Sequence, residues 1–96
     1  RNIFYIKGNL LITPSEDLGI LPGVTRDTIM EIGSEIGLKI IKTKISREDV
    51  NSMDEAFISS SGIGLLPCYW DGWNSNFKLT KQLQKYLFNY INESCN

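Results

Sequence analysis

The run Leu18–Thr28 places the tightest constraint on what this chain can fold into. A Pro-Gly turn in it is followed at once by apolar residues at helical spacing, so we expect a helix to begin at Val24 or Thr25. The first N–H groups of a helix lack acceptors within it, and the helix dipole is positive at that end. Because Thr25 adds a hydroxyl and no acidic side chain follows until Asp27, the run predicts a seat for an anion, above all a phosphate.

Length and composition narrow the class of protein. The 96 residues, 42% of them hydrophobic, suffice for one domain with a modest core. A net charge of −1 argues against nucleic acid or an anionic membrane as a partner. We find no apolar run of membrane-spanning length and no signal peptide. Cys68 and Cys95 show neither metal nor disulfide spacing, which favours a reducing, cytoplasmic location.

Histidine is absent from the chain, which removes the commonest general base and the commonest metal ligand. We therefore predict no metal site. The chain also starts at Arg1 without a methionine and is strand-like by Ile3, so we interpret it as a piece of a longer protein.

The spacing of apolar residues predicts an α/β or α+β domain with about five strands and two main helices. We expect the strands at residues 2–6, 10–13, 38–45, 56–59 and 65–70. The main helices are expected at 24–36 and 79–91, with a short one at 47–53 capped by Ser46. Gly37 is expected to end the first helix, and Pro67 predicts that the last strand is an edge or irregular one. The expected buried face of the last helix is Leu79, Leu83, Tyr86, Leu87, Tyr90 and Ile91.

A second candidate anion site is the small-residue run Ser59–Gly62, which follows a buried strand. Its hydroxyls and uncovered backbone can donate to an anion, while a plain polar turn is the alternative interpretation. The helix start at Val24 has its own alternative, since a Pro-Gly pair before a helix often does no more than initiate it. The two candidates together are more informative than either alone.

Five other residues carry weaker signals. We expect Arg26 to be a surface or interface residue, close to the anion seat. Trp70 and Trp73 are expected to pack against the last helix or a subunit interface. Asp54-Glu55 is a carboxylate pair, but neighbouring residues face different ways, so the pair is poor evidence for acid–base chemistry.

Several segments resemble one family in order and spacing. They are Asn2–Phe4, Thr13-Pro14, Gly19–Asp27, Met53–Ser61, Leu66-Pro67 and Asp71-Gly72. Together they are similar to the C-terminal domain of class IV aminotransferases, which are fold-type IV pyridoxal-phosphate enzymes. The resemblance implies the D-amino-acid-aminotransferase-like fold, with a mixed sheet or pseudo-barrel. It also implies that residues 1–96 are a single domain, the C-terminal fragment of a larger two-domain enzyme.

The resemblance also implies roles for particular residues. Val24 and Thr25 would hold the phosphate of pyridoxal 5'-phosphate, and Ser61 would contact the same phosphate. Ser60 and Gly62 would line the place of the substrate carboxylate. In the family the Schiff-base lysine lies upstream of the matching segment. We therefore assign no catalytic residue here and expect the chain alone to be inactive.

For the parent protein the resemblance leaves three reactions open. The parent would be a 4-amino-4-deoxychorismate lyase, which makes 4-aminobenzoate and pyruvate, or a branched-chain or D-amino-acid aminotransferase. The short segment Trp73–Thr80 and the absence of an acidic residue in Gly62–Gly64 depart from the branched-chain pattern, and they favour a lyase-like member or an unassigned aminotransferase. The partners of the parent protein would be a small amino acid or aminodeoxychorismate as substrate, the missing N-terminal domain, and a second copy of the protein in a homodimer. The hypothesis of another class is a non-catalytic anion-binding or interaction domain.

Overall fold

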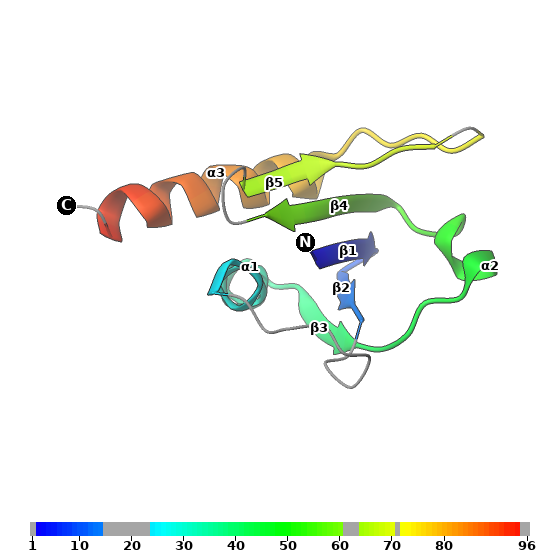
Figure 1. The fold of residues 1–96 in the computed structure, drawn as a ribbon, viewed down its shortest axis with the longest axis horizontal. Helices are drawn as coiled ribbons and strands as arrows, with labels where there is room; N and C mark the ends of the chain where they lie inside the picture. Colours follow the sequence, from blue (N-terminus) through cyan, green and yellow to red (C-terminus); the bar gives the residue numbers. More distant parts are fainter. Residues whose placement is uncertain (1, 15–23, 61–63, 71, 95–96) are drawn as a thin grey trace.

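The computed structural model describes residues 2–14, 24–60, 64–70 and 72–94 of the chain. Strands and helices follow one another in an irregular order (Figure 1). They are β1 Asn2–Lys7, β2 Leu10–Thr13, α1 Val24–Glu35, β3 Lys39–Lys42, α2 Arg47–Val50, β4 Glu55–Ser60, β5 Gly64–Pro67 and α3 Lys78–Ser94. The α+β class is confirmed: one five-stranded mixed sheet is combined with the two main helices α1 and α3.

The sheet has the strand order β3-β2-β1-β4-β5. β1 and β2 form the expected hairpin, and β4 pairs antiparallel with both β1 and β5. β2 and β3 are parallel, so the chain must cross back from the end of β2 to the start of β3. α1 is this crossover. β5 is an edge strand, as Pro67 predicts, because proline has no N–H to donate to a further strand.

α1 begins and ends where the sequence predicts. Gly37 follows it with a φ of 99°, a left-handed conformation that favours glycine, and its N–H donates to Ser34 O at 3.2 Å. Gly33 lets the helix approach β2 closely, because a Cβ there would lie 2.8 Å from Cδ2 of Leu11. A larger side chain at Gly33 would require either the buried Leu11 side chain or α1 itself to move.

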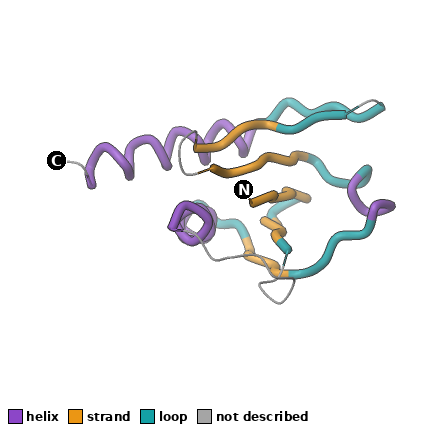
Figure 2. Tube along the Cα trace, viewed as in Figure 1, coloured by secondary structure: helices purple, strands orange, loops and turns teal. Residues whose placement is uncertain are grey.

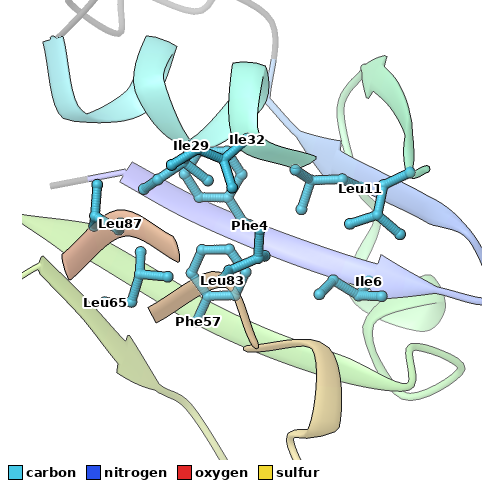
Figure 3. Close-up of a cluster of buried hydrophobic side chains, with 10 residues drawn as sticks. Phe4, Ile6, Leu11, Ile29, Ile32, Phe57, Leu65, Leu83 and Leu87 are labelled. Carbon is cyan, nitrogen blue, oxygen red and sulfur yellow. The ribbon is translucent and has the colours of Figure 1, made fainter. Parts of the chain in front are cut away.

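One face of the sheet is covered by α1 and α3, and the main core lies between them (Figure 3). Phe4 of β1 and Phe57 of β4 stack at its centre with ring centroids 5.0 Å apart. The other buried members are Ile6, Leu11, Ile29, Ile32, Leu38, Leu65, Leu83 and Leu87. Burying each of these side chains contributes roughly 1.5–3 kcal/mol, so this cluster is the main source of stability.

The opposite face of the sheet carries a second, smaller cluster of buried residues: Tyr5, Ile12, Met53 and Ala56. Around them lie half-buried residues, which are Ile3, Leu10, Ile41, Ile45, Val50, Cys68, Trp70 and Trp73. These come from the strands and from the two connections at residues 43–54 and 68–77. Figure 2 shows these connections, mostly in teal, at the opposite side of the picture from the C-terminal end of α3.

Several expected boundaries differ from the structure. The strand expected at 38–45 is only four residues long, because its parallel partner β2 ends at Thr13 and the last contact is Thr43 N–H to Thr13 O at 2.9 Å. The helix expected at 47–53 ends at Val50, although Ser46 caps it as predicted. Tyr86, expected on the buried face of α3, is 45% exposed.

The part of the chain that the structure describes contains no helix that is both long and apolar enough to cross a membrane.

Candidate functional site

Backbone pairing brings several chain segments to one edge of the sheet. Asn2, the first residue of β1, lies opposite Ser59 of β4, and Ser60 lies opposite Gly64, the first residue of β5. β2 ends on the same side because it runs antiparallel to β1. The first turn of α1 lies there too, because its third residue, Arg26, donates from Nη2 to the carbonyl of Pro14, the residue after β2. We call this edge, where β1, β5 and α1 begin and β2 and β4 end, the site edge (Figure 1).

The predicted site residues that the structure describes lie at the site edge. Val24 and Thr25 are the first two residues of α1, so their backbone N–H groups belong to the first turn, which has no acceptors within the helix. Ser60 is the last residue of β4, so it is part of a strand rather than of a loop. Ser61 and Gly62 lie outside the described residues. The sheet topology thus places the ends of both candidate segments on the same side of the fold.

Arg26 differs from our expectation of a surface or interface residue, because its side chain is completely buried within this domain. Its Nη2 donates to the carbonyl of Pro14 at 2.8 Å, which ties the first turn of α1 to the residue after β2. The sequence does contain a signal for this burial. Arg26 precedes Ile29 by three positions and Gly33 by seven, which is the spacing of the α1 stripe that faces the sheet.

Ser59 adds a buried hydroxyl next to the site edge. Its side chain is only 1% exposed, and its Oγ has no hydrogen-bond partner among the described residues. Ser59 follows Phe57 by two positions in β4, and residues two apart in a strand share a face, so Ser59 lies on the face that the helices cover. A buried hydroxyl normally has a partner, so this one is a candidate donor to a bound group.

The carboxylate pair at 54–55 has a structural role. Glu55 is buried, and its Oε2 and Oε1 accept from the N–H groups of Leu79 at 3.0 Å and Thr80 at 2.7 Å. Asp54 is exposed and accepts from Gly8 N–H at 2.7 Å. The two side chains face different ways, as expected. Glu55 caps α3 from a strand distant in sequence, which the sequence pattern did not reveal.

The tryptophans stack on each other rather than on α3. Their ring centroids are 4.0 Å apart, and Phe77 contacts Trp73 edge-on at 6.1 Å. Trp73 Nε1 donates to Met53 O and Trp70 Nε1 to Asn51 Oδ1, both at 2.9 Å. Among the described residues they pack against the cluster around Tyr5 and Met53 rather than against α3, and the alternative that we stated, a subunit interface, stays a prediction. Their hydrogen bonds join the connection after β5 (residues 68–77) to the connection before β4 (residues 43–54).

Among the described residues, Cys68 and Tyr5 are the groups whose pKa values are clearly shifted, and both lie on the face of the sheet opposite α1 and α3, which we call the second face. Burial raises the pKa of the Cys68 thiol above its ordinary value. Burial also raises the pKa of Tyr5, and a negative charge on the neighbouring Cys68 would raise it further. Both groups therefore stay neutral near pH 7, and neither is activated as a nucleophile.

The chemistry that the described part of the site edge offers is donation of hydrogen bonds to an anion. It combines the N–H groups at the start of α1, a buried guanidinium and a buried hydroxyl. Among the described residues, no group of three or more His, Cys, Asp and Glu side chains is arranged to hold a metal ion.

Comparison with known proteins identifies the family. The sequence profile of amino-transferase class IV matches residues 1–69. Branched-chain-amino-acid aminotransferase of Escherichia coli K12 is 35% identical over 67 residues, which cover 70% of this chain and 22% of that protein. Aminodeoxychorismate lyase of Bacillus subtilis is 39% identical over 66 residues, which cover 69% of this chain and 22% of that protein.

A solved structure gives the same result for the fold. The branched-chain amino acid aminotransferase of Thermobaculum terrenum, in its PLP form, is similar with a TM-score of 0.84 and 26% identity. The similarity covers 94% of this chain and 31% of that one. The chain thus belongs to the class IV aminotransferase family. It spans about a fifth of the length of the relatives from Escherichia coli and Bacillus subtilis.

Proposed function

We propose that this chain is the C-terminal, phosphate-holding domain of a two-domain pyridoxal-phosphate enzyme of the class IV aminotransferase family. One observation carries the proposal: α1 begins at the edge where β4 ends, above a buried guanidinium, within the stretch that matches the family. The relative from Thermobaculum terrenum, which is similar over nearly the whole chain and is in its PLP form, supports this choice of cofactor.

The groups at the site edge suit a phosphate monoester. The N–H groups of Val24 and Thr25, with the Thr25 hydroxyl, would hold the phosphate, and Ser61 would add a second hydroxyl. Ser60 and Gly62 would line the place of the substrate carboxylate. All of these groups donate hydrogen bonds, so the set fits an anion and would bind a cation poorly.

Pyridoxal phosphate supplies a ring that delocalises the electrons of a carbanion formed on the substrate. The residues of this chain would bind and orient the phosphate and the substrate carboxylate. The lysine that attaches the cofactor would come from the N-terminal domain, and the parent would be a homodimer. We therefore expect no turnover from the 96-residue chain alone, and measurable turnover by that purified chain would contradict this.

For the reaction we favour elimination of pyruvate from aminodeoxychorismate, with amino transfer as the second candidate. The 39% identity to the lyase of Bacillus subtilis supports the first, and the 35% identity to the aminotransferase of Escherichia coli supports the second. A small amino acid would be the substrate in the second case. The hypothesis of a non-catalytic anion-binding domain would require a parent that carries no cofactor.

The proposed cofactor site can be tested by substitution in the full-length protein. Thr25→Ala should weaken retention of pyridoxal phosphate on the order of tenfold, because it removes one hydrogen bond to a charged group. Equilibrium dialysis measures the affinity. Ser34→Ala is the matched control, since the exposed Ser34 lies near the opposite end of the same helix and should leave the affinity unchanged. Failure of the unaltered protein to bind pyridoxal phosphate would contradict the proposed function.

The reaction can be assigned with the same cofactor-loaded protein. Aminodeoxychorismate is supplied, and 4-aminobenzoate and pyruvate are sought by mass spectrometry. Their formation would assign the lyase. If neither product forms and the protein instead exchanges amino groups between a branched-chain or D-amino acid and a 2-oxo acid, the second candidate is correct.

A further inference from the structure

The two helices that cover the sheet carry opposite charges on their outer sides. The outer side of α1 presents a row of three exposed acidic residues, which are Asp27, Glu31 and Glu35. The outer side of α3 presents a row of three exposed basic residues, which are Lys78, Lys81 and Lys85. Spacings of three and four positions place each set on one face of its helix. We call these sets the acidic row and the basic row.

Each row is unfavourable within its own helix. Like charges three or four positions apart repel one another on a helix surface. Glu35 is the last residue of α1, where the helix dipole is negative, and Lys78 is the first residue of α3, where the dipole is positive. Among the described residues, the two rows form no ion pair with each other. Both rows are therefore stabilised when a surface of the opposite charge lies against them.

The two rows match each other in length and in hydrogen-bonding character. At a rise of about 1.5 Å per residue, the acidic row spans about 12 Å and the basic row about 10 Å. Beside the basic row is a surface hollow of about 320 Å³, whose described lining residues are Gln82, Lys85, Tyr86 and Asn89. All four of these side chains can donate hydrogen bonds, so the hollow suits carboxylates such as those of the acidic row.

The crossing of the two helices allows the rows to meet in a symmetric pair. α1 is seen along its axis in Figure 1, whereas α3 runs across the picture, so the two helices cross at a steep angle. Both helices cover the same face of the sheet. A two-fold axis between their two directions exchanges those directions, and it lays α1 of one copy along α3 of the other. Both contacts of such a pair then join an acidic row to a basic row.

We propose that the outer side of α1 and α3 is an interface between two copies of this chain, in which the acidic row of each copy lies along the basic row of the other. The charges set the orientation of the two copies. Phe88 and Tyr86, which are 67% and 45% exposed on α3, flank the basic row and add apolar area to the contact. The inference rests on the homodimer of the proposed function and names its surface, but it depends on no property of the cofactor.

The test reverses one charge in each row of the full-length protein. Glu31→Lys places a cation against the basic row of the other copy, and Lys85→Glu places a carboxylate against the acidic row. Each variant alone should raise the dissociation constant of the dimer on the order of tenfold, because each reversal turns an attraction into a repulsion at both contacts. Sedimentation equilibrium measures this constant.

An equimolar mixture of the two variants is the sharpest measurement. In the mixed dimer each contact again joins opposite charges, so the mixture should associate as tightly as the unaltered protein. Glu48→Lys is the matched control, because Glu48 is exposed on α2 and the change in charge equals that of Glu31→Lys. It should leave the dissociation constant unchanged.

Three results would overturn the inference. The first is a dimer that neither reversal weakens, and the second is a mixture that does not recover the association. The third is an unaltered protein that stays monomeric; if both reversals then lower its thermal stability, the rows contact the N-terminal domain of the same chain instead. If circular dichroism shows that one variant does not fold, the other is compared with Glu48→Lys, and equal dissociation constants would overturn the inference. Failure of both variants to fold would also overturn it.

Retention of pyridoxal phosphate, measured on the same unaltered protein, separates this inference from the proposed function. If the cofactor is not retained but the reversals and their mixture behave as expected, the proposed function fails and the interface stands. If the cofactor is retained and neither reversal changes the dissociation constant, only the interface fails.

Discussion

The two faces of the five-stranded sheet differ in what covers them and in how completely their apolar residues are buried. The face with Phe4 and Phe57 is covered by α1 and α3, and its central residues are fully buried (Figure 3). The opposite face has a small buried cluster around Tyr5 and Ala56, with a larger ring of half-buried apolar residues. Within the described residues, its cover comes from connections and from the four-residue helix α2 rather than from a helical layer.

This difference indicates which face provides most of the stability of the domain, and on which face we expect contacts with another part of a protein. A completely enclosed core accounts for most of the stability of a domain of this size. Half-buried apolar residues on the second face contribute less and leave surface that another part of a protein can cover. This is consistent with a chain that spans between about a fifth and a third of the length of the relatives described above.

The largest effect is expected from the centre of the helix-covered face. Phe57→Ala should lower the free energy of unfolding by about 3–5 kcal/mol, because it removes a fully buried ring that stacks on Phe4. The neighbouring Ile58 is half-buried and points to the other face, so Ile58→Ala should cost only about 1–2 kcal/mol. Urea denaturation measures both. Equal losses would contradict the difference between the faces.

The next effect concerns the polar contact that fastens α3 to the sheet. Glu55→Ala should cost about 2–3 kcal/mol, because it leaves the buried N–H groups of Leu79 and Thr80 without their acceptor. Asp54→Ala is the matched control, since Asp54 is exposed and bonds to the turn residue Gly8. We expect it to cost less than about 1 kcal/mol. Thermal unfolding followed by circular dichroism would reveal the order, and a larger effect of Asp54→Ala would refute the capping role.

A smaller effect is expected on the second face. Trp73→Phe keeps an aromatic ring against Trp70 but removes the Nε1 donor to Met53 O, so it should cost about 1 kcal/mol. Trp70→Phe removes a donor to the exposed Asn51, for which water can substitute, and should cost less. The two free energies of unfolding can be compared by denaturation in urea. If Trp70→Phe is the more damaging change, the Trp73 bond does not fasten the two connections.

How far the sequence predicted the fold depends on how local each signal is. The α1 helix, the Gly37 stop and the Ser46 cap were predicted correctly, because each depends on a few neighbouring residues. The length of β3 was wrong, because it depends on where its partner β2 ends. A strand ends when its partner does, and the local pattern around residues 43–45 carries no information on that.

The candidate site shows the same limit. The Val24–Thr25 helix start and the strand before Ser60 were predicted from local patterns, whereas their meeting at one edge follows from the sheet topology. The roles of Val24, Thr25 and Ser60 remain predictions. The burial of Arg26 was missed although its spacing from Ile29 and Gly33 places it on the stripe of α1 that faces the sheet. The capping by Glu55 was missed because it depends on a contact between segments distant in sequence.

The smallest effect is a pH dependence that distinguishes the second face. Burial raises the pKa of Cys68, so the folded state keeps its thiol protonated where the unfolded state begins to ionise. The stabilisation is complete below the unfolded pKa and is lost as the pH rises through the folded pKa. Tyr5, whose pKa is raised by burial and by the neighbouring Cys68, adds to the same alkaline loss.

In a background with Cys95 replaced by serine, Cys68→Ser should therefore flatten the fall in unfolding free energy above about pH 8.5. The Cys68 thiol should also react with iodoacetamide more slowly than a free thiol at pH 8, because only the thiolate is the nucleophile. Unfolding at a series of pH values and the alkylation rate, followed by mass spectrometry, measure these effects. A thiol as reactive as free cysteine would mean that this face is more open to water than the half-buried position of Cys68 implies.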